Sequence, residues 1–396
     1  MIETLVVRTF GIDVSDSKTS NGLHWKVGRL FPWLFTENVP VCFLGVGRGW
    51  RGWKQNGSFS SHASLRAIPS NSRYLYHVNR ILAWVTNFID IVRFARKTTK
   101  KRLIVMAHTP LFGLGATLAK VILRDRILFI VRIVGNEPSV SLLVRRSRWR
   151  FRLEQMIEGF VLRTGDLVIP MGNFTYDLSI AYGVDPRKIV VLPFPVTWPI
   201  RPKNVEFPPR PTVLFCGRLT KEKGVHILLR AVQLVQRRIR DARLVVVGDT
   251  DNKTYRRELE KTAEALGIRD SISFLGWISN DQIAERYQES WVLVVPSIWE
   301  EGLGMVMVEA GLMERPVIAS DLGGIKDFIQ DGVNGLLVAP GDIQALANAI
   351  ASVLENQKYA HEMGKRNNVV ARRYLEDFDR SVPRVQQAIS ELAEIK

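Results

Sequence analysis

The sequence predicts an α/β protein made of two doubly wound parallel sheets. Short apolar runs alternate along the 396-residue chain with stretches whose apolar residues recur at helical spacing. Strands that are apolar throughout are buried on both faces, and helical crossovers between them make a sheet parallel. Seven prolines between Pro193 and Pro211 interrupt this pattern, because proline lacks an N–H and fixes φ. We therefore expect one sheet on each side of that segment.

The apolar runs give the expected strands in order. Strand candidates of the second half are Val213–Cys216, Leu244–Val247, Ile272–Leu275, Val292–Val295, Val317–Ala319 and Leu336–Val338. Those of the less regular first half are Leu5–Val7, Val41–Leu44, Leu103–Met106, Ile127–Val131 and Leu167–Ile169. The first helix of the second half is marked by Val225, Leu228, Leu229, Val232 and Val235. A final helix is expected over Arg380–Ile395.

These elements predict the domain organisation. We expect a Rossmann-like N-terminal domain over residues 1–195 and a proline-rich linker over 196–211. A second Rossmann-like domain follows over 212–375, and a C-terminal helix over 376–396 is placed to return to the first domain.

Composition narrows the class of protein. The chain is 46% apolar and 24% charged, which is ordinary for a globular protein. No apolar run reaches about 18 residues, and the start lacks the pattern of a secretory signal, so we expect a cytoplasmic protein without a transmembrane helix. Both cysteines, Cys42 and Cys216, lie in apolar runs and are expected to be reduced core residues.

The net charge of +16 is confined to the first half. Residues 1–200 hold 28 Lys and Arg against 12 Asp and Glu, whereas the remainder holds 27 of each. Such an asymmetry is typical of proteins that meet an anionic surface, an anionic substrate or a nucleic acid. A basic surface without a partner is the alternative.

The turn after Val213–Cys216 is the first candidate binding motif. Gly217 permits a tight turn, and Arg218 and Lys223 bring two cations to the start of the next helix. Free N–H groups and the helix dipole already favour an anion there. The turn therefore predicts a diphosphate site, and a solvated basic turn is the alternative.

The loop after Val292–Val295 is the second candidate. Gly302 and Gly304 let the backbone come close to a ligand where the next helix begins. Glu309 lies within that otherwise apolar helix. A buried carboxylate needs donors, and a ribose diol would supply two; a solvated helix-face glutamate is the alternative.

Several ordered motifs over roughly residues 211–355 resemble the nucleotide-binding domain of glycosyltransferase family 4, a group with the GT-B fold. The matching positions are Gly217-Arg218, Lys223-Gly224, Phe274-Leu275-Gly276, Glu301 with Glu309, Pro316-Val317-Ile318-Ala319-Ser320 and Gly323-Gly324. The resemblance implies that Arg218 and Lys223 bind the donor diphosphate and that Glu309 binds the ribose. It further implies a sugar contact from Glu301 and the amides of Gly302, Leu303 and Gly304.

Three positions depart from the family pattern. Leu303 replaces a common Phe, and Asp327 stands where Glu is usual. Glu314 stands where the family usually ends the Glu309 helix with Gly. A left-handed glutamate costs roughly 1–2 kcal/mol, unless the helix ends differently.

The first half resembles the family more thinly. Ser20-Asn21-Gly22 stands where the family has a glycine loop near the donor phosphates, which implies a donor contact from Gly22. His108 stands where the family has a histidine that reaches the donor sugar, although a structural histidine is the alternative. Gly135-Asn136-Glu137 is a further candidate.

The function implied is a retaining transfer of a sugar from a nucleotide diphosphate sugar to an acceptor hydroxyl, with Glu301 and His108 as catalytic residues. Cations and helix N-termini stabilise a leaving diphosphate without a metal, and no Asp-x-Asp motif is found, so we expect neither metal nor cofactor. A glycoside hydrolase is disfavoured, because eight helical residues separate Glu301 from Glu309 by about 12 Å. A sugar-nucleotide epimerase and a non-catalytic sugar-nucleotide-binding subunit stay open, whereas no nucleic-acid-binding motif is visible.

Two basic segments with aromatic residues predict attachment to an anionic membrane surface. In the first, Trp84, Phe88, Ile91 and Phe94 accompany Arg93, Arg96, Lys97, Lys100, Lys101 and Arg102. In the second, Arg145, Arg146, Arg148, Arg150 and Arg152 bracket Trp149 and Phe151. We expect a peripheral protein at the inner face of the membrane, with a surface-glycan or lipid-linked acceptor. The alternative is that the apolar face of the first segment packs on its own sheet.

Overall fold

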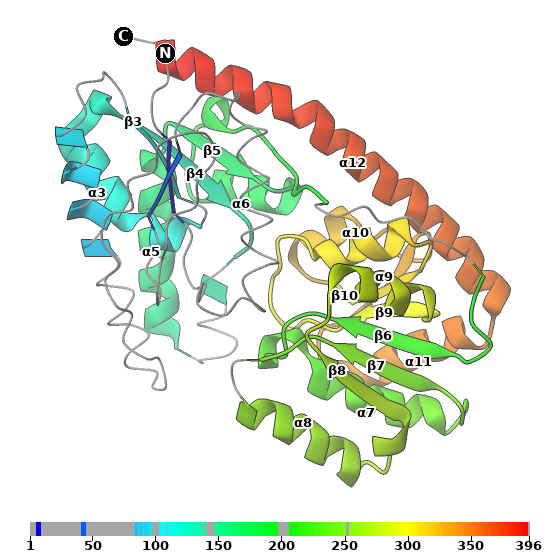
Figure 1. Ribbon diagram of the computed structural model, residues 1–396. Coiled ribbons are helices and arrows are strands. Elements are labelled where there is room, and N and C mark those ends of the chain that lie inside the picture. The colour runs from blue at the N-terminus through cyan, green and yellow to red at the C-terminus, as the bar shows by residue number, and fades with distance from the viewer. Residues whose placement is uncertain are drawn as a thin grey trace. The chain divides into compact units, whose positions relative to one another are not determined.

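The computed structural model describes residues 5–8, 41–44, 84–85, 87–89, 91–93, 95–96, 103–107, 109–136, 138–139, 147–196, 206–250 and 253–394. The chain divides into two units (Figure 1). Unit 1 comprises Met1–Val134, Trp149–Thr197 and Phe378–Lys396, and unit 2 comprises Gly135–Arg148 and Trp198–Asp377.

Unit 1 holds a five-stranded parallel sheet in the order β2-β1-β3-β4-β5. Its strands are β1 Leu5–Arg8, β2 Val41–Leu44, β3 Leu103–Ala107, β4 Ile127–Ile133 and β5 Leu167–Pro170. Its described α-helices include α3 Leu114–Leu123, α5 Arg148–Thr164 and α6 Asn173–Ala181. Residues 84–85, 87–89, 91–93 and 95–96 are also helical.

Alternation along β3 and β4 sends side chains to two separate cores. Leu103, Val105 and Ala107 pack with residues of α3 and α5. Ile104 and Met106 pack with the C-terminal part of the last helix. Helices therefore cover both faces of this sheet, as a doubly wound arrangement requires.

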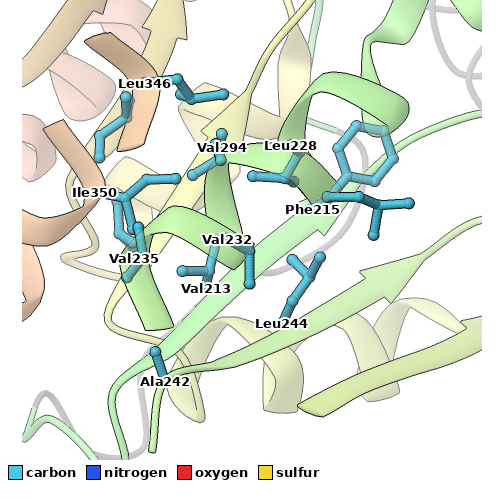
Figure 2. Packing of buried hydrophobic residues seen from close by; sticks show 14 of the residues in the cluster. Val213, Phe215, Leu228, Val232, Val235, Ala242, Leu244, Val294, Leu346 and Ile350 are labelled. Carbon is cyan, nitrogen blue, oxygen red and sulfur yellow. The ribbon is translucent and has the colours of Figure 1, made fainter. Parts of the chain in front are cut away.

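Unit 2 holds a six-stranded parallel sheet in the order β11-β10-β9-β6-β7-β8. Its strands are β6 Thr212–Cys216, β7 Arg243–Val247, β8 Ile272–Gly276, β9 Val292–Val295, β10 Val317–Ser320 and β11 Gly335–Val338. Its helices include α7 Val225–Gln236, α8 Lys253–Ala265, α9 Asn280–Gln288, α10 Met305–Leu312 and α11 Ile343–Leu354. Figure 2 shows side chains of α7 and α11, among them Leu228 and Ile350, packed with those of β6 and β7. The predicted strands are present in both units.

The last helix, α12 Gln357–Glu394, is much longer than the predicted Arg380–Ile395. The earlier start follows from an apolar stripe that includes Ala360, Met363 and Ala371, all fully buried. Residues up to Asp377 belong to unit 2, and those from Phe378 belong to unit 1.

Glu314, just after helix α10, adopts the left-handed conformation, which is one of the two outcomes that the sequence left open. Its φ is 54°. The N–H of Arg315 donates to Ala310 O at 2.9 Å, and that of Glu314 donates to Gly311 O at 2.9 Å. These two bonds form a complete Schellman motif, so a glutamate occupies the position that favours glycine.

The first basic segment corrects part of the membrane prediction. Ile91 is buried, and Phe88 packs against the core formed with β3, α3 and α5. The Trp84 indole donates to Leu111 O at 2.9 Å. The apolar face of this segment therefore packs on its own sheet, while Arg93 and Arg96 are exposed. Within the described ranges, no helix is long and apolar enough to cross a membrane.

Candidate functional site

The order of strands in unit 2 locates the candidate site. The chain adds β7 and β8 on one side of β6, and β10 and β11 on the far side of β9, while β6 and β9 are neighbours. In an open parallel sheet, ligands bind outside the carboxyl ends of the strands where the order reverses. A ligand is therefore expected at the loops that follow β6 and β9.

These two loops touch through their backbones. The N–H of Ile298 donates to Glu222 O at 2.8 Å. Gly224 has a φ of 72°, and a Cβ there would lie 1.8 Å from the carbonyl oxygen of Pro296. Glycine is required at this position by both the conformation and the close approach. The basic turn and the glycine-rich loop are thus in direct backbone contact at the start of α7.

An ion pair joins the two loops at their side chains. Lys223 Nζ lies 2.8 Å from Glu301 Oε2, and the exposed fractions of the two side chains are 18% and 7%. The Ser297 hydroxyl donates to Glu301 Oε1, and Lys223 Nζ lies 5.8 Å from the centre of the Trp299 ring. Sequence reasoning treated Lys223 and Glu301 as separate groups, whereas the structure brings them together.

Arg218 differs from Lys223 in its environment. Its side chain is exposed, and its guanidinium forms no hydrogen bond or ion pair with another described residue. Lys223 is therefore held in place by an ion pair, whereas no described residue holds the guanidinium of Arg218. Their combined charge lies at the sheet edge to which β6 and β9 point their carboxyl ends.

Glu309 is buried within α10, as predicted, and a tyrosine donates to it. Its side chain is 7% exposed. The Tyr287 hydroxyl of α9 lies 3.0 Å from Glu309 Oε2 and 3.2 Å from Val306 O. Burial, and then the charge of Glu309, raise the pKa of Tyr287 well above its ordinary value. Tyr287 consequently stays a protonated donor, and no motif in the sequence indicated it.

The glycine-rich loop is also held by two other segments. Gly135 forms an antiparallel bridge with Glu301, and Asn136 Nδ2 donates to Glu300 Oε2. A Cβ at Gly324 would lie 1.4 Å from Gly302 O. Of the predicted segment Gly135-Asn136-Glu137, two residues therefore reach the site, and Glu137 lies outside the described residues.

Some predicted site residues are not tested by this geometry. Gly22 and His108 lie outside the described residues. Leu303 is half-buried, and a Cβ at Gly304 would make only ordinary contacts, at 3.7 Å from Met307 Cε and 3.8 Å from Glu301 Oε2. Contacts with the described residues therefore do not require glycine at position 304. Asp327 is exposed at the end of a 3-10 turn.

The arrangement suits an anionic ligand that also carries hydroxyl groups. Arg218, Lys223 and the first amides of α10 supply positive charge and N–H donors. Glu301 and Glu309 supply acceptors. Among the described residues, no group of three or more His, Cys, Asp and Glu could hold a metal ion.

Comparison with known proteins finds a family match over the part of the chain that holds these loops. Residues 196–369 match the family model described as Glycosyl transferases group 1. The chain is 35% identical over 156 residues to the alpha-D-kanosaminyltransferase of Streptomyces kanamyceticus, covering 39% of each protein. It is 32% identical over 161 residues to a GDP-mannose-dependent alpha-(1-6)-phosphatidylinositol monomannoside mannosyltransferase of Mycobacterium tuberculosis, covering 39% of this chain and 41% of that protein. The matched part thus spans about two fifths of these relatives.

Solved structures are similar over the full length. Sucrose-phosphate synthase from Thermosynechococcus elongatus superposes with a TM-score of 0.75 at 20% identity, covering 100% of both chains. Anabaena HepE in complex with UDP superposes with a TM-score of 0.66 at 17% identity, covering 98% of this chain and 99% of that chain. The predicted fold class, GT-B with two Rossmann-like units, is confirmed. Residues 196–369 are related to glycosyltransferases, and membership of family 4 stays a prediction.

Proposed function

We propose that this protein is a retaining glycosyltransferase of family 4 type, which moves a sugar from a nucleotide diphosphate sugar to an acceptor hydroxyl. The observation that carries the proposal is the anchored cation Lys223, beside Glu301, at the reversal point of the unit 2 sheet. The family match over residues 196–369 covers the same loops.

In this proposal, each group of the site binds one part of the donor. Lys223 and Arg218 bind the diphosphate, and Glu309 accepts from the ribose hydroxyls. The sugar contacts Glu301 and the backbone of residues 302–304. Lys223 and Arg218, together with the amides at the start of α10, stabilise the charge that develops on the leaving diphosphate. Catalytic contacts from His108 and Glu301 are part of the proposal.

The acceptor we propose is a surface glycan or glycolipid, reached from the cytoplasmic side. One relative is named for action on a phosphatidylinositol monomannoside, which is lipid-linked. Structural neighbours were solved with UDP and with UDP and glucose. The relative's name is compatible with a membrane-borne acceptor for this chain, and the titles of the two structures are compatible with a sugar-nucleotide donor.

The proposal is tested first by binding and then by turnover. A panel of nucleotide sugars is screened by thermal shift, and a true donor at 100 times its Kd adds about 2.7 kcal/mol of stability. The best donor is then incubated with and without a panel of lipid and glycan acceptors, while nucleoside diphosphate release and the anomeric product are followed by NMR. Acceptor-dependent release with retained configuration is expected.

The other outcomes identify the alternatives. Donor turnover to an epimer without any acceptor means an epimerase. Binding without turnover under any condition means a non-catalytic subunit. Absence of stabilisation by every nucleotide sugar contradicts the proposal outright.

A further inference from the structure

Helix α5 of unit 1 exposes apolar side chains and buries acidic ones. Trp149, Leu153, Met156 and Phe160 are 65%, 44%, 70% and 40% exposed. Their spacing of three and four residues places them in one stripe along the helix. Both acidic residues of the helix, Glu154 and Glu158, are buried at 3% and 0% exposure. The helix also buries Val161 and Leu162, but an ordinary surface helix exposes its acidic residues rather than a stripe of large apolar ones.

Basic side chains run beside this stripe. Arg148, Arg152 and Arg163 are exposed on α5, and Arg163 also donates to Tyr182 O at 2.8 Å. The Arg150 guanidinium lies 5.3 Å from the centre of the Trp149 ring. The exposed surface of α5 is therefore apolar and cationic, without an acidic group from the helix itself.

The neighbouring helices also expose apolar side chains. Helix α3 exposes Leu118, Val121 and Ile122, and the helical segment before it exposes Val85 and Ile89. All these helices pack through one core onto the same face of the unit 1 sheet, and Figure 1 shows α3 and α5 on the side of that sheet away from α12. Single exposed apolar residues are normal, but a group on adjacent helices marks an interaction surface.

We propose that the exposed stripe of α5 inserts into the interface of an anionic phospholipid membrane, with its arginines among the lipid headgroups. Tryptophan, phenylalanine and leucine beside a basic edge are typical of interfacial helices. Charge complementarity supports this occupant, because residues 1–200 hold 28 basic against 12 acidic residues. A second copy is disfavoured, since a symmetric contact would set the arginines of the two helices against each other.

Co-sedimentation of the full chain with vesicles tests the proposal independently of glycosyl transfer. The vesicles are phosphatidylcholine alone or with phosphatidylglycerol, at low and high salt. The wild type is expected to bind only the anionic vesicles. The triple variant Trp149→Gln/Met156→Gln/Phe160→Gln is expected to lower the partition coefficient at least about tenfold. The double variant Arg148→Gln/Arg152→Gln is expected to lower it roughly 25-fold at low salt.

A matched control removes exposed apolar side chains from unit 2. Trp277 and Val369 are 46% and 68% exposed, and Trp277→Gln/Val369→Gln is expected to bind as the wild type does. Circular dichroism verifies that each variant is folded. Absence of binding to anionic vesicles at low salt overturns the proposal, and so does undiminished binding of the α5 triple variant. A dimer in analytical ultracentrifugation that the triple variant dissociates identifies a second copy as the occupant instead.

Discussion

Glu301 and Glu309 are both buried carboxylates, and they differ in the group that holds them. Glu301 pairs with the ammonium of Lys223 and accepts from Ser297. Glu309 accepts from the neutral hydroxyl of Tyr287. A phosphate group of a ligand would compete with the Glu301 carboxylate for the ammonium of Lys223. A hydroxyl group of a ligand would instead be a second hydrogen-bond donor to Glu309, beside Tyr287.

This difference predicts separate effects of two isosteric substitutions. Glu309→Gln is expected to weaken both nucleoside diphosphate and sugar donor by about 10- to 150-fold, because it removes the charge from an acceptor worth about 1.5–3 kcal/mol. Glu301→Gln is expected to weaken binding of the sugar donor only, because it removes a sugar contact. Binding of the nucleoside diphosphate is not weakened, because the substitution also releases Lys223 for the diphosphate. Calorimetric titration of both ligands measures this, and wild-type affinity in Glu309→Gln contradicts the ribose role.

His226 predicts a pH dependence of stability. Burial, and then the charges of Arg230 and Lys221, lower its pKa from the ordinary value of 6.5. The unfolded chain therefore binds the proton more readily than the folded chain, so the free energy of unfolding falls as pH drops below about 6.5. Urea unfolding at pH 7 and pH 5 is expected to show a smaller fall for His226→Gln than for the wild type. Equal falls in the two proteins refute this assignment.

At the level of single residues, the sequence predicted the charged groups better than their neutral partners. Glu309 was found because an acid within an apolar helix is unusual. Tyr287 could not be found, because it lies on another helix and its contact depends on how α9 and α10 pack. Nothing in the sequence distinguishes Ser297 from the other serines, because its contact with Glu301 depends on the conformation of the loop.

The end of α10 shows how one helix is fastened by another. Asn368 of α12 donates to Gly311 O and Leu312 O at 3.0 and 3.2 Å, which satisfies carbonyls at the helix end. Asn367 donates to Arg315 O at 2.8 Å. A Cβ at Gly364 would lie 2.1 Å from Glu314 O, so α12 approaches this turn closely. The orientation of Glu309 thus depends on α12 as well as on α10.

Replacing Glu314 by glycine is expected to stabilise unit 2. The left-handed conformation costs a glutamate roughly 1–2 kcal/mol, and the extra backbone freedom of glycine in the unfolded chain offsets part of the gain. Glu314→Gly should therefore raise the free energy of unfolding by about 0.5–1 kcal/mol in urea titrations. A loss of stability would show that the Glu314 side chain compensates for its own strain.

At the level of elements, strands were predicted more accurately than helix limits. Each central strand contains a run of apolar residues, so its place is visible in the sequence, although β4 also carries the buried Arg132. The start of α12 was missed because its first half mixes buried apolar residues with exposed charges over a long stretch. Pro383 within that helix is also a signal that normally indicates a boundary.

At the level of the whole molecule, the two units carry different surfaces. The sequence located the excess of positive charge in residues 1–200, but not the face that displays it. Part of it lies on α5, whose rotation about its axis places Glu154 and Glu158 inside and Arg148, Trp149 and Arg152 outside. Unit 2 holds the proposed anion site, at the reversal point of its sheet.

The central claim is that the basic turn after β6 binds the diphosphate of a nucleotide. Isothermal titration of the donor's nucleoside diphosphate into wild type, Lys223→Ala and Lys221→Ala tests it most directly, because Lys221 is an exposed cation of the same turn. Lys223→Ala is expected to bind about 10- to 150-fold more weakly, and Lys221→Ala to bind nearly as the wild type does. Equal affinity of Lys223→Ala and wild type would contradict the claim.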